Sequence, residues 1–276
     1  MDDLSTFELP APRPSVRARF KPGVPWKAIR VSAFYVGLLL TWKLVVMAEI
    51  WPEYTFPAPE DVFEDLKLAA QDGILWEAIA ESMRRMAVGY SMSIVIGLAV
   101  GIAMGTWRYI DETLGSLVLG LQSLPSVTWF PLAVLWFGLN ERAVIFVVLM
   151  GSVCSVAISS ATGVKSIPPL LLRAASMFGG PWWQRLFYVI LPAMLPSMVQ
   201  GLKLGWSFAW RSLLAAELLF HTISLGQLLT TGRDLNDVSL VIAIMLVIVV
   251  LGMAMDRIVF GRLEGWVNER WGLRAA

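Results

Sequence analysis

The sequence has few of the side chains on which metalloenzymes and disulfide-stabilised domains depend. It contains one histidine, His221, and one cysteine, Cys154, so an intrachain disulfide is excluded and no Cys/His zinc site is expected. It also lacks the phosphate-binding G-x-x-x-x-G-K-[ST] pattern and the H-E-x-x-H pattern. We therefore expect no nucleotide hydrolysis by this chain, and Cys154, inside an apolar run, to be a packing residue.

Charge is scarce as well. Only 16% of the residues are charged, 57% are hydrophobic, and the mean hydropathy is +0.67. A soluble domain of this length does not need so much apolar surface, so the composition predicts an all-α membrane protein whose surroundings are a lipid bilayer. The net charge of +1 gives no indication of a nucleic-acid partner.

Six segments are apolar and long enough to be transmembrane helices. In chain order they are 31–51, 86–107, 113–140, 143–164, 196–221 and 238–255. The third is interrupted by Pro125 and Pro131, which predicts a kinked helix or one entered through an irregular turn. In the first, Lys43 is expected to extend toward the headgroups, and Arg84 and Arg85 are expected to anchor the second at the interface.

The predicted organisation follows from these spans and from the placement of charge. Residues 1–30 are rich in proline and arginine and are expected to be a disordered basic tail on the cytoplasmic side. Residues 52–82 are acidic and predict an extracytoplasmic amphipathic segment. Residues 83–262 form the core, and 263–276 an interfacial tail on the cytoplasmic side.

Three glycines in the second predicted span recur every four residues. Gly97, Gly101 and Gly105 therefore lie on one side of the helix, where the absence of side chains lets another helix approach closely. The pattern predicts helix packing and leaves the partner helix open.

The segment 165–192 separates two long apolar runs and is too rich in proline and glycine to cross a membrane. A short helix is expected to begin near Leu170, after two prolines, and to end at Gly179, which is expected to have a left-handed backbone angle. By itself this pattern is also typical of an ordinary surface loop between two spans.

The spacing within this segment resembles the "EAA" loop of binding-protein-dependent ABC importer permeases. The matching residues are Arg173, Ala174, Ala175, Gly179, Val189, Leu191 and Pro192. Arg173 stands where the family usually has glutamate and Val189 where isoleucine is usual, and the first difference inverts a charge. The resemblance implies a coupling helix that docks on a cytoplasmic ATPase.

A second stretch of the sequence indicates one branch of this family. Residues 124–141, LPSVTWFPLAVLWFGLNE, are similar to the nitrate, sulfonate, taurine and bicarbonate branch of these permeases, in which such residues run alongside the translocation pathway. Pro125 and Trp129 are the candidate pathway residues that this similarity implies. Ser126 replaces a second proline that is common there, and a plain kinked span would have the same secondary structure.

The resemblance implies a six-helix, type I ABC importer permease-like (MetI-like) bundle in the inner membrane of a bacterial cell, with both termini cytoplasmic. The implied partners are a second copy of the chain, two cytoplasmic ATPase subunits that hold ATP and Mg²⁺, and an extracytoplasmic solute-binding protein. No cofactor is expected on this chain. The implied solute is small, such as nitrate, a sulfonate, taurine or bicarbonate.

Two other classes of membrane protein are alternatives. An ion-gradient-driven secondary transporter would place paired ionisable residues or broken helices at the midplane, together with an internal repeat, and no clear repeat is visible. An intramembrane enzyme would require an acid, base or metal set that the sequence does not display.

The fifth predicted span carries Lys203, Arg211 and Glu217. Arg211 lies at membrane depth and is expected to face the bundle or the pathway, with backbone carbonyls near Pro125, a second subunit or an anionic solute as its acceptor. Glu217 is a second candidate pathway residue. His221 follows it by four residues, which predicts a local hydrogen bond on one helix face, or else a proton relay.

Overall fold

The computed structural model describes residues 26–52, 54–177, 179 and 181–271. Within these ranges every regular element is a helix, which confirms the predicted all-α class. Most of the predicted basic tail, residues 1–25, lies outside the described residues, as does the end of the predicted interfacial tail, 272–276. The first helix, α1 (Trp26–Met47), begins five residues earlier than predicted.

Five helical segments of the described chain are long and apolar enough to cross a membrane, and a bent pair gives a sixth. The five are α1, α3 (Ile74–Thr106), α6 (Glu141–Lys165), the run Trp182–Glu217 and the run Val238–Arg270. The fourth run contains α8 (Trp182–Arg185), a π-helical turn (Leu186–Ile190) and α9 (Leu191–Glu217). The fifth contains α11 (Val238–Met255), a second π-helical turn (Asp256–Phe260) and α12 (Gly261–Arg270).

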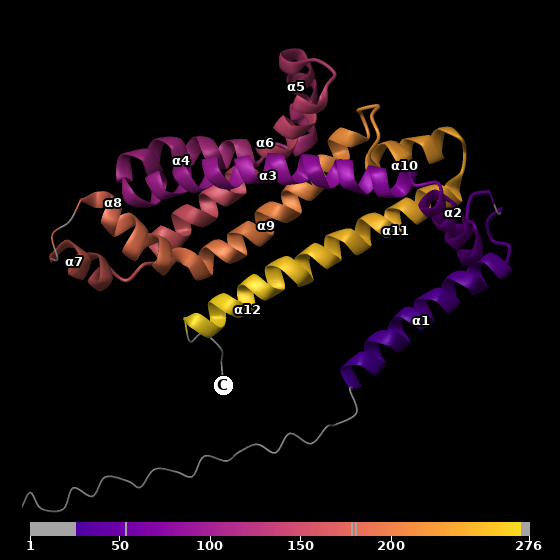
Figure 1. Cartoon of the computed structure of the whole chain (residues 1–276), viewed down its shortest axis with the longest axis horizontal. Helices are drawn as coiled ribbons and strands as arrows, with labels where there is room; N and C mark the ends of the chain where they lie inside the picture. Colours follow the sequence, from indigo (N-terminus) through magenta and orange to yellow (C-terminus); the bar gives the residue numbers. More distant parts are fainter. Residues whose placement is uncertain (1–25, 53, 178, 180, 272–276) are drawn as a thin grey trace, which may run out of the picture.

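The bent pair is the predicted interrupted span. Its first part is α4 (Arg108–Gln122), and a short 3₁₀ turn (Ser126–Thr128) leads into α5 (Trp129–Phe137), which projects from the bundle after a bend of 94° (Figure 1). Pro125 lies in the break, and its carbonyl accepts a hydrogen bond from Thr128 Oγ1 at 2.6 Å. Pro131 does not interrupt the helix as predicted, because it occupies the first turn of α5, where backbone N–H groups have no intrahelical partner.

The long helices run side by side along one axis in Figure 1. α7 (Pro169–Met177) and α8 lie at one end, called here the α7 end. α2 (Pro59–Gln71) and α10 (Leu225–Asp234) lie at the other, called the α10 end. α1 stands apart from the bundle and is attached near α2, where Lys43 forms an ion pair with Glu60.

The three glycines of α3 lie against α6. A Cβ atom added to Gly97 would come within 2.8 Å of Val156 Cβ, and one added to Gly101 within 2.3 Å of the Ala157 carbonyl oxygen. Gly105 meets Val164 in the same way, at 2.5 Å. The partner that the sequence left open is therefore a helix of the same chain.

Besides the start of α1, other predicted boundaries differ from the structure. The fifth predicted span, 196–221, corresponds to α9, which runs from Leu191 to Glu217, and both ends of the predicted core also move. α3 begins at Ile74, directly after Gly73 with its left-handed φ of +80°, so residues 74–82 belong to the core helix rather than to the acidic surface segment. The acidic side chains of Glu77 and Glu81, in the first turns of α3, made this part of the sequence resemble a surface segment. At the other end, α12 continues α11 through the π-helical turn across the predicted boundary at residue 262.

Candidate functional site

The predicted coupling segment forms a separate helix at the α7 end. α7 begins with Pro169, whose fixed φ suits a first helical turn. It exposes large apolar side chains, with Leu170 76% and Met177 88% exposed. Gly179 has a φ of +56°, the left-handed angle that favours glycine. The segment presents an apolar surface that no other described residue covers.

The residues of the predicted motif lie within α7, just after it, and at the start of α9. Arg173 is exposed, while Ala174 and Ala175 are partly buried. Leu191 and Pro192, also partly buried, form the first turn of α9, where proline is tolerated.

A cavity of 500 Å³ separates α7 from the ends of α3 and α6. Trp107 and Trp182 line it, with ring centroids 6.4 Å apart. Nearby, Lys165 Nζ lies 2.6 Å from Asp111 Oδ1 and ties the end of α6 to α4. These contacts hold α8 and the start of the coupling segment against the α3–α4 corner.

Arg211 lines a second cavity, of 300 Å³, next to the break between α4 and α5. Its Nη2 donates to Ser207 Oγ at 3.0 Å, and its guanidinium lies 5.3 Å from the centre of the Phe208 ring. Pro125 lines the same cavity, but its carbonyl is already bonded to Thr128. Among the described residues, no carboxylate lies within ion-pair distance of Arg211.

The position of this cavity across the membrane follows from the residues of α6 that line it. Met150 and Cys154, near the middle of that 25-residue helix, line the cavity beside Arg211. Ser155 lines it too, and its buried hydroxyl oxygen has no hydrogen-bond partner within the part of the chain that the structure describes. Arg211 is therefore exposed near the centre of a membrane span, beside an unsatisfied polar group.

Trp129, the other candidate on the resembling stretch, does not line this cavity. Its ring lies 6.3 Å from that of Phe146, where α5 packs on α6. The structure thus brings Pro125 and Arg211 together and places Trp129 in an aromatic contact.

Glu217 is fully buried and lines none of these cavities. Its Oε1 lies 3.1 Å from Arg85 Nη1, and its two oxygens accept from Ser82 Oγ at 2.9 and 2.8 Å. The backbone N–H of Gly226 donates to it at 3.3 Å. The expected hydrogen bond with His221 does not form, because α9 ends at Glu217 and His221 is exposed beyond that end.

Arg85 is the polar residue whose role the sequence analysis missed. It was expected at the interface, yet it is 4% exposed, and besides Glu217 it donates to Thr222 Oγ1 at 3.1 Å. Glu81 and Glu141 each lie 3.7 Å from its guanidinium. Ser82 and Arg85, three positions apart on one face of α3, were the available signal, but their partner is more than 130 residues away in the chain.

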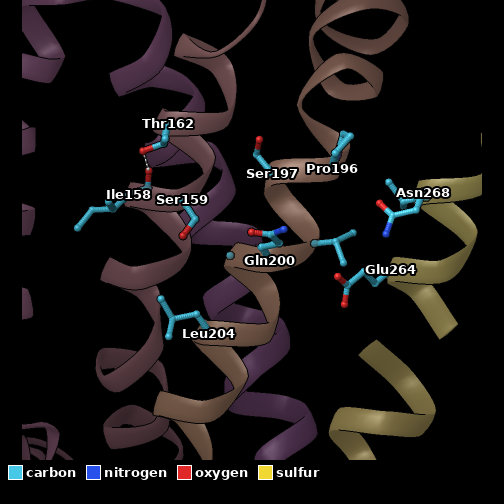
Figure 2. A pocket seen from close by; sticks show the side chains of 12 residues that line it. Ile158, Ser159, Thr162, Pro196, Ser197, Gln200, Leu204, Glu264 and Asn268 are labelled. Atoms are coloured by element: carbon cyan, nitrogen blue, oxygen red, sulfur yellow. Dashed lines mark hydrogen bonds between the residues drawn. The ribbon is translucent and has the colours of Figure 1, made fainter. Parts of the chain in front are cut away.

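A third cavity, of 510 Å³, lies between α6, α9 and α12. Figure 2 shows Gln200 of α9 between Ser159 of α6 and Glu264 of α12, with Ser197 one turn along α9. Most of the labelled side chains that carry a polar group point toward this space.

Comparison with known proteins assigns the family. Residues 93–261 match the family described as "Binding-protein-dependent transport system inner membrane component". The matched region runs from the third quarter of α3 to the start of α12, so it contains the coupling segment, the cavity beside α7 and the cavity beside Arg211. The α12 residues that line the third cavity lie just beyond it.

Two curated relatives are similar over most of their length. The chain is 30% identical to the taurine transport system permease protein TauC of Escherichia coli (strain K12) over 256 residues, which cover 88% of this chain and 93% of the relative. It is 32% identical over 203 residues to the bicarbonate transport system permease protein CmpB of Synechococcus elongatus, covering 73% and 70%.

A solved structure supports the fold. The chain resembles a structure of the MetNI methionine ABC transporter in an inward-facing conformation, with a TM-score of 0.60 and 17% identity over 71% of this chain and 98% of the other. The predicted type I importer permease fold is confirmed. With the family match and the relatives, the chain belongs to the inner membrane components of binding-protein-dependent ABC importers.

Proposed function

We propose that this permease forms the translocation pathway for a small organic or inorganic anion and that Arg211 lies on that pathway. The observation that carries the proposal is the environment of Arg211: exposed, near the middle of a membrane span, and without a carboxylate partner among the described residues. An arginine at such depth costs a few kcal/mol on insertion scales unless it is paired or faces water. A water-filled pathway meets this requirement.

The charge of Arg211 indicates the sign of the solute. A guanidinium with a free donor edge binds carboxylates, sulfonates and other oxyanions through charge-assisted hydrogen bonds. The relatives named above transport taurine and bicarbonate, and both carry an anionic group, which supports the same class for this chain.

The energy source is a separate ATPase subunit in this proposal. Two copies of the permease pair in the membrane, and each docks the exposed apolar surface of α7 on one ATPase, which supplies ATP and Mg²⁺ binding. The α7 end is then cytoplasmic, together with both termini, and the α10 end faces an extracytoplasmic solute-binding protein. ATPase closure moves the two α7 helices and switches the spans between inward-open and outward-open states.

The test is uptake by cells that carry the chain with its native partners. Arg211→Gln should assemble at the normal level and lose uptake of the transported anion, with labelled taurine, bicarbonate and nitrate as the probes. The matched control is Arg142→Gln, an exposed arginine in the first turn of α6 outside the three cavities. Full uptake by a well-assembled Arg211→Gln complex would remove Arg211 from the pathway.

A further inference from the structure

Arg211 is the first of a series of polar side chains along α9. Ser207, Lys203, Gln200 and Ser197 follow it at steps of four, four, three and three residues. At 100° per residue they fall within about 120° of the helix circumference, so they share one face. Each lines one of the cavities described above or the one described next, and the series runs from the middle of the membrane toward the α7 end.

Lys203 lines a cavity of 370 Å³ between α9 and α11. Ser207 lines it too, so the residue that accepts the hydrogen bond from Arg211 also borders the space around Lys203. The charged residues of this cavity are Lys203, Arg257 and Asp256, two cations and one anion, which leaves it with a formal charge of +1.

Lys203 is still at membrane depth. The glycines on either side of it, Gly201 and Gly205, lie against Ser159 and Val156 in the second half of α6. Its side chain is nevertheless 43% exposed, and its Nζ lies 3.1 Å from Asp256 Oδ1, which is 45% exposed. An ion pair so accessible within a span requires water or a partner group beside it.

The wall behind this pair is rigid, whereas the pair itself is not enclosed. Trp206 and Trp210 are buried and stacked, with an interplanar angle of 11°, and Phe260 packs on Trp206 with centroids 6.1 Å apart. Asp256 opens the π-helical turn that ends α11, a type of turn that often occurs at functional sites. The aromatic wall fixes the cavity, and the charged groups at its mouth remain free to exchange partners.

We propose that Lys203 is a second anion-binding position, about 12 Å along α9 from Arg211 toward the α7 end, and that Asp256 is its internal counter-ion. The ligand class is a small oxyanion or sulfonate, and the inference rests on the proposed anion pathway. Asp256 neutralises Lys203 when the position is empty, and an anion that arrives from Arg211 must compete with it. This competition keeps binding weak, as release from a multi-site pathway requires.

The test uses a cysteine placed between the two cations. The chain's one cysteine is first removed by Cys154→Ala, and Ser207→Cys is added to this variant. The measurement is made on the nucleotide-free transporter assembled with its ATPase. The measured quantity is the ratio of modification rates by an anionic sulfonatoethyl and a cationic trimethylammonium-ethyl methanethiosulfonate reagent. Ethanesulfonate is the protecting anion.

Expected results differ in sign for the two partners of the ion pair. Lys203→Gln should lower the anionic-to-cationic ratio by about fivefold or more, and Asp256→Asn should raise it, because each removes one unit charge from the cavity that residue 207 lines. Ethanesulfonate should slow the anionic reagent in the parent but not in Lys203→Gln. The control is Ser116→Cys on the exposed side of α4, whose ratio should not respond to either change.

Three outcomes would overturn the inference. A Ser207→Cys thiol that reacts with neither reagent would mean that lipid or a second copy of the chain covers this face of α9. The ratio could stay unchanged in both variants while both lose thermal stability equally, which would make the ion pair structural. Absence of ethanesulfonate protection would exclude anion binding. Because this readout needs no transport, it fails independently of the Arg211→Gln uptake test.

Discussion

Two arginines on membrane-spanning helices, Arg85 and Arg211, meet opposite environments. Arg85 is buried among Glu217, Thr222 and two further carboxylates near the α10 end. Arg211 is exposed beside a cavity at the middle of the membrane, with a serine hydroxyl as its hydrogen-bond acceptor. The first has a carboxylate and a hydroxyl as hydrogen-bond partners, with its buried Nε–H left without one among the described residues, whereas the second has room for an exchangeable partner.

The comparison separates two uses of charge in a bilayer. A buried ion pair with additional hydrogen bonds offsets its own desolvation and fixes the helices that carry it. Here Glu217 also accepts from Ser82 and Gly226, so the cluster joins α3, the end of α9 and the start of α10. Arg211, exposed and closer to the middle of the membrane, has no comparable set of partners among the described residues, which fits the pathway role proposed for it.

The largest expected effect comes from breaking the buried cluster. Glu217→Ala leaves the Arg85 guanidinium buried without its closest carboxylate and should lower the free energy of unfolding by about 3–5 kcal/mol. The thermal unfolding temperature of the purified complex measures this loss. Glu112→Ala, which removes an exposed partner of Arg108, should cost at most about 1 kcal/mol.

A second substitution tests whether the stability lost in Glu217→Ala comes from the unpaired charge of Arg85. Arg85→Met in the Glu217→Ala background removes the unpaired charge and should recover part of the lost stability. No recovery, or a Glu217→Ala variant as stable as the parent, would contradict a structural role for the pair.

The close-packed α3–α6 interface should tolerate change less well than the surface of α4. Gly101→Ala places a Cβ atom 2.3 Å from the Ala157 carbonyl and should cost about 1–3 kcal/mol through overpacking. Gly120→Ala is the matched control, since a Cβ there meets nothing within 4 Å and alanine favours the helix by about 0.5–1 kcal/mol. The two unfolding temperatures should shift in opposite directions, and a shared direction would rule out close packing as the reason for Gly101.

At the α7 end, one substitution should weaken docking of the ATPase while the permease still inserts into the membrane. Gly179→Val puts a β-branched side chain at a φ of +56°, at a cost of about 1 kcal/mol or more. The permease should still insert, while coprecipitation of the ATPase should fall. Gly265→Val on α12, where a Cβ also meets nothing within 4 Å, is the control.

Normal ATPase recovery with Gly179→Val would argue against docking through this segment. Arg173→Glu in the same assay asks whether the partner compensates the inverted charge, and a weaker interaction is expected if it does.

The smallest effect concerns Asp65 on α2. Burial, and then the charge of Asp237, raise the pKa of this carboxyl. The folded protein therefore holds this proton more tightly than the unfolded chain, so stability falls as pH rises through the unfolded and then the folded pKa, and the penalty is complete above both. Asp65→Asn should raise stability by a few tenths of a kcal/mol at neutral pH.

This gain should shrink as the pH is lowered through the carboxyl range. The measurement is the unfolding temperature of variant and parent as a function of pH, with Glu64→Gln, at the neighbouring exposed position, as the control. A gain independent of pH would mean that the repulsion from Asp237 is not its cause.

The sequence was sufficient for most of the fold because apolar runs and breakers are local signals. The order of the spans, the interruption at Pro125 and the short helix before Gly179 all follow from residues close in the chain. The start of α3 was misplaced because Glu77 and Glu81 resemble a surface segment, although Leu75 and Ala78 on the other face of the helix are buried in the bundle. Hydropathy does not report such coverage.

The candidate site was less predictable, because its contacts join distant residues. Arg211 and Pro125 could be proposed together from depth and resemblance. The pairing of Arg85 with Glu217 depends on how α3, α9 and α10 pack, and no local pattern encodes it. For the same reason His221 was expected beside Glu217, whereas the helix end separates them.

The most direct test compares Arg85→Gln and Arg211→Gln in one preparation, with assembly and anion uptake measured for each. We predict that Arg85→Gln lowers the amount and thermal stability of the assembled complex, while each complex that does assemble retains uptake. Arg211→Gln should assemble as the parent does and lose uptake. The account is contradicted if Arg211→Gln loses assembly before transport, or if it assembles and transports normally.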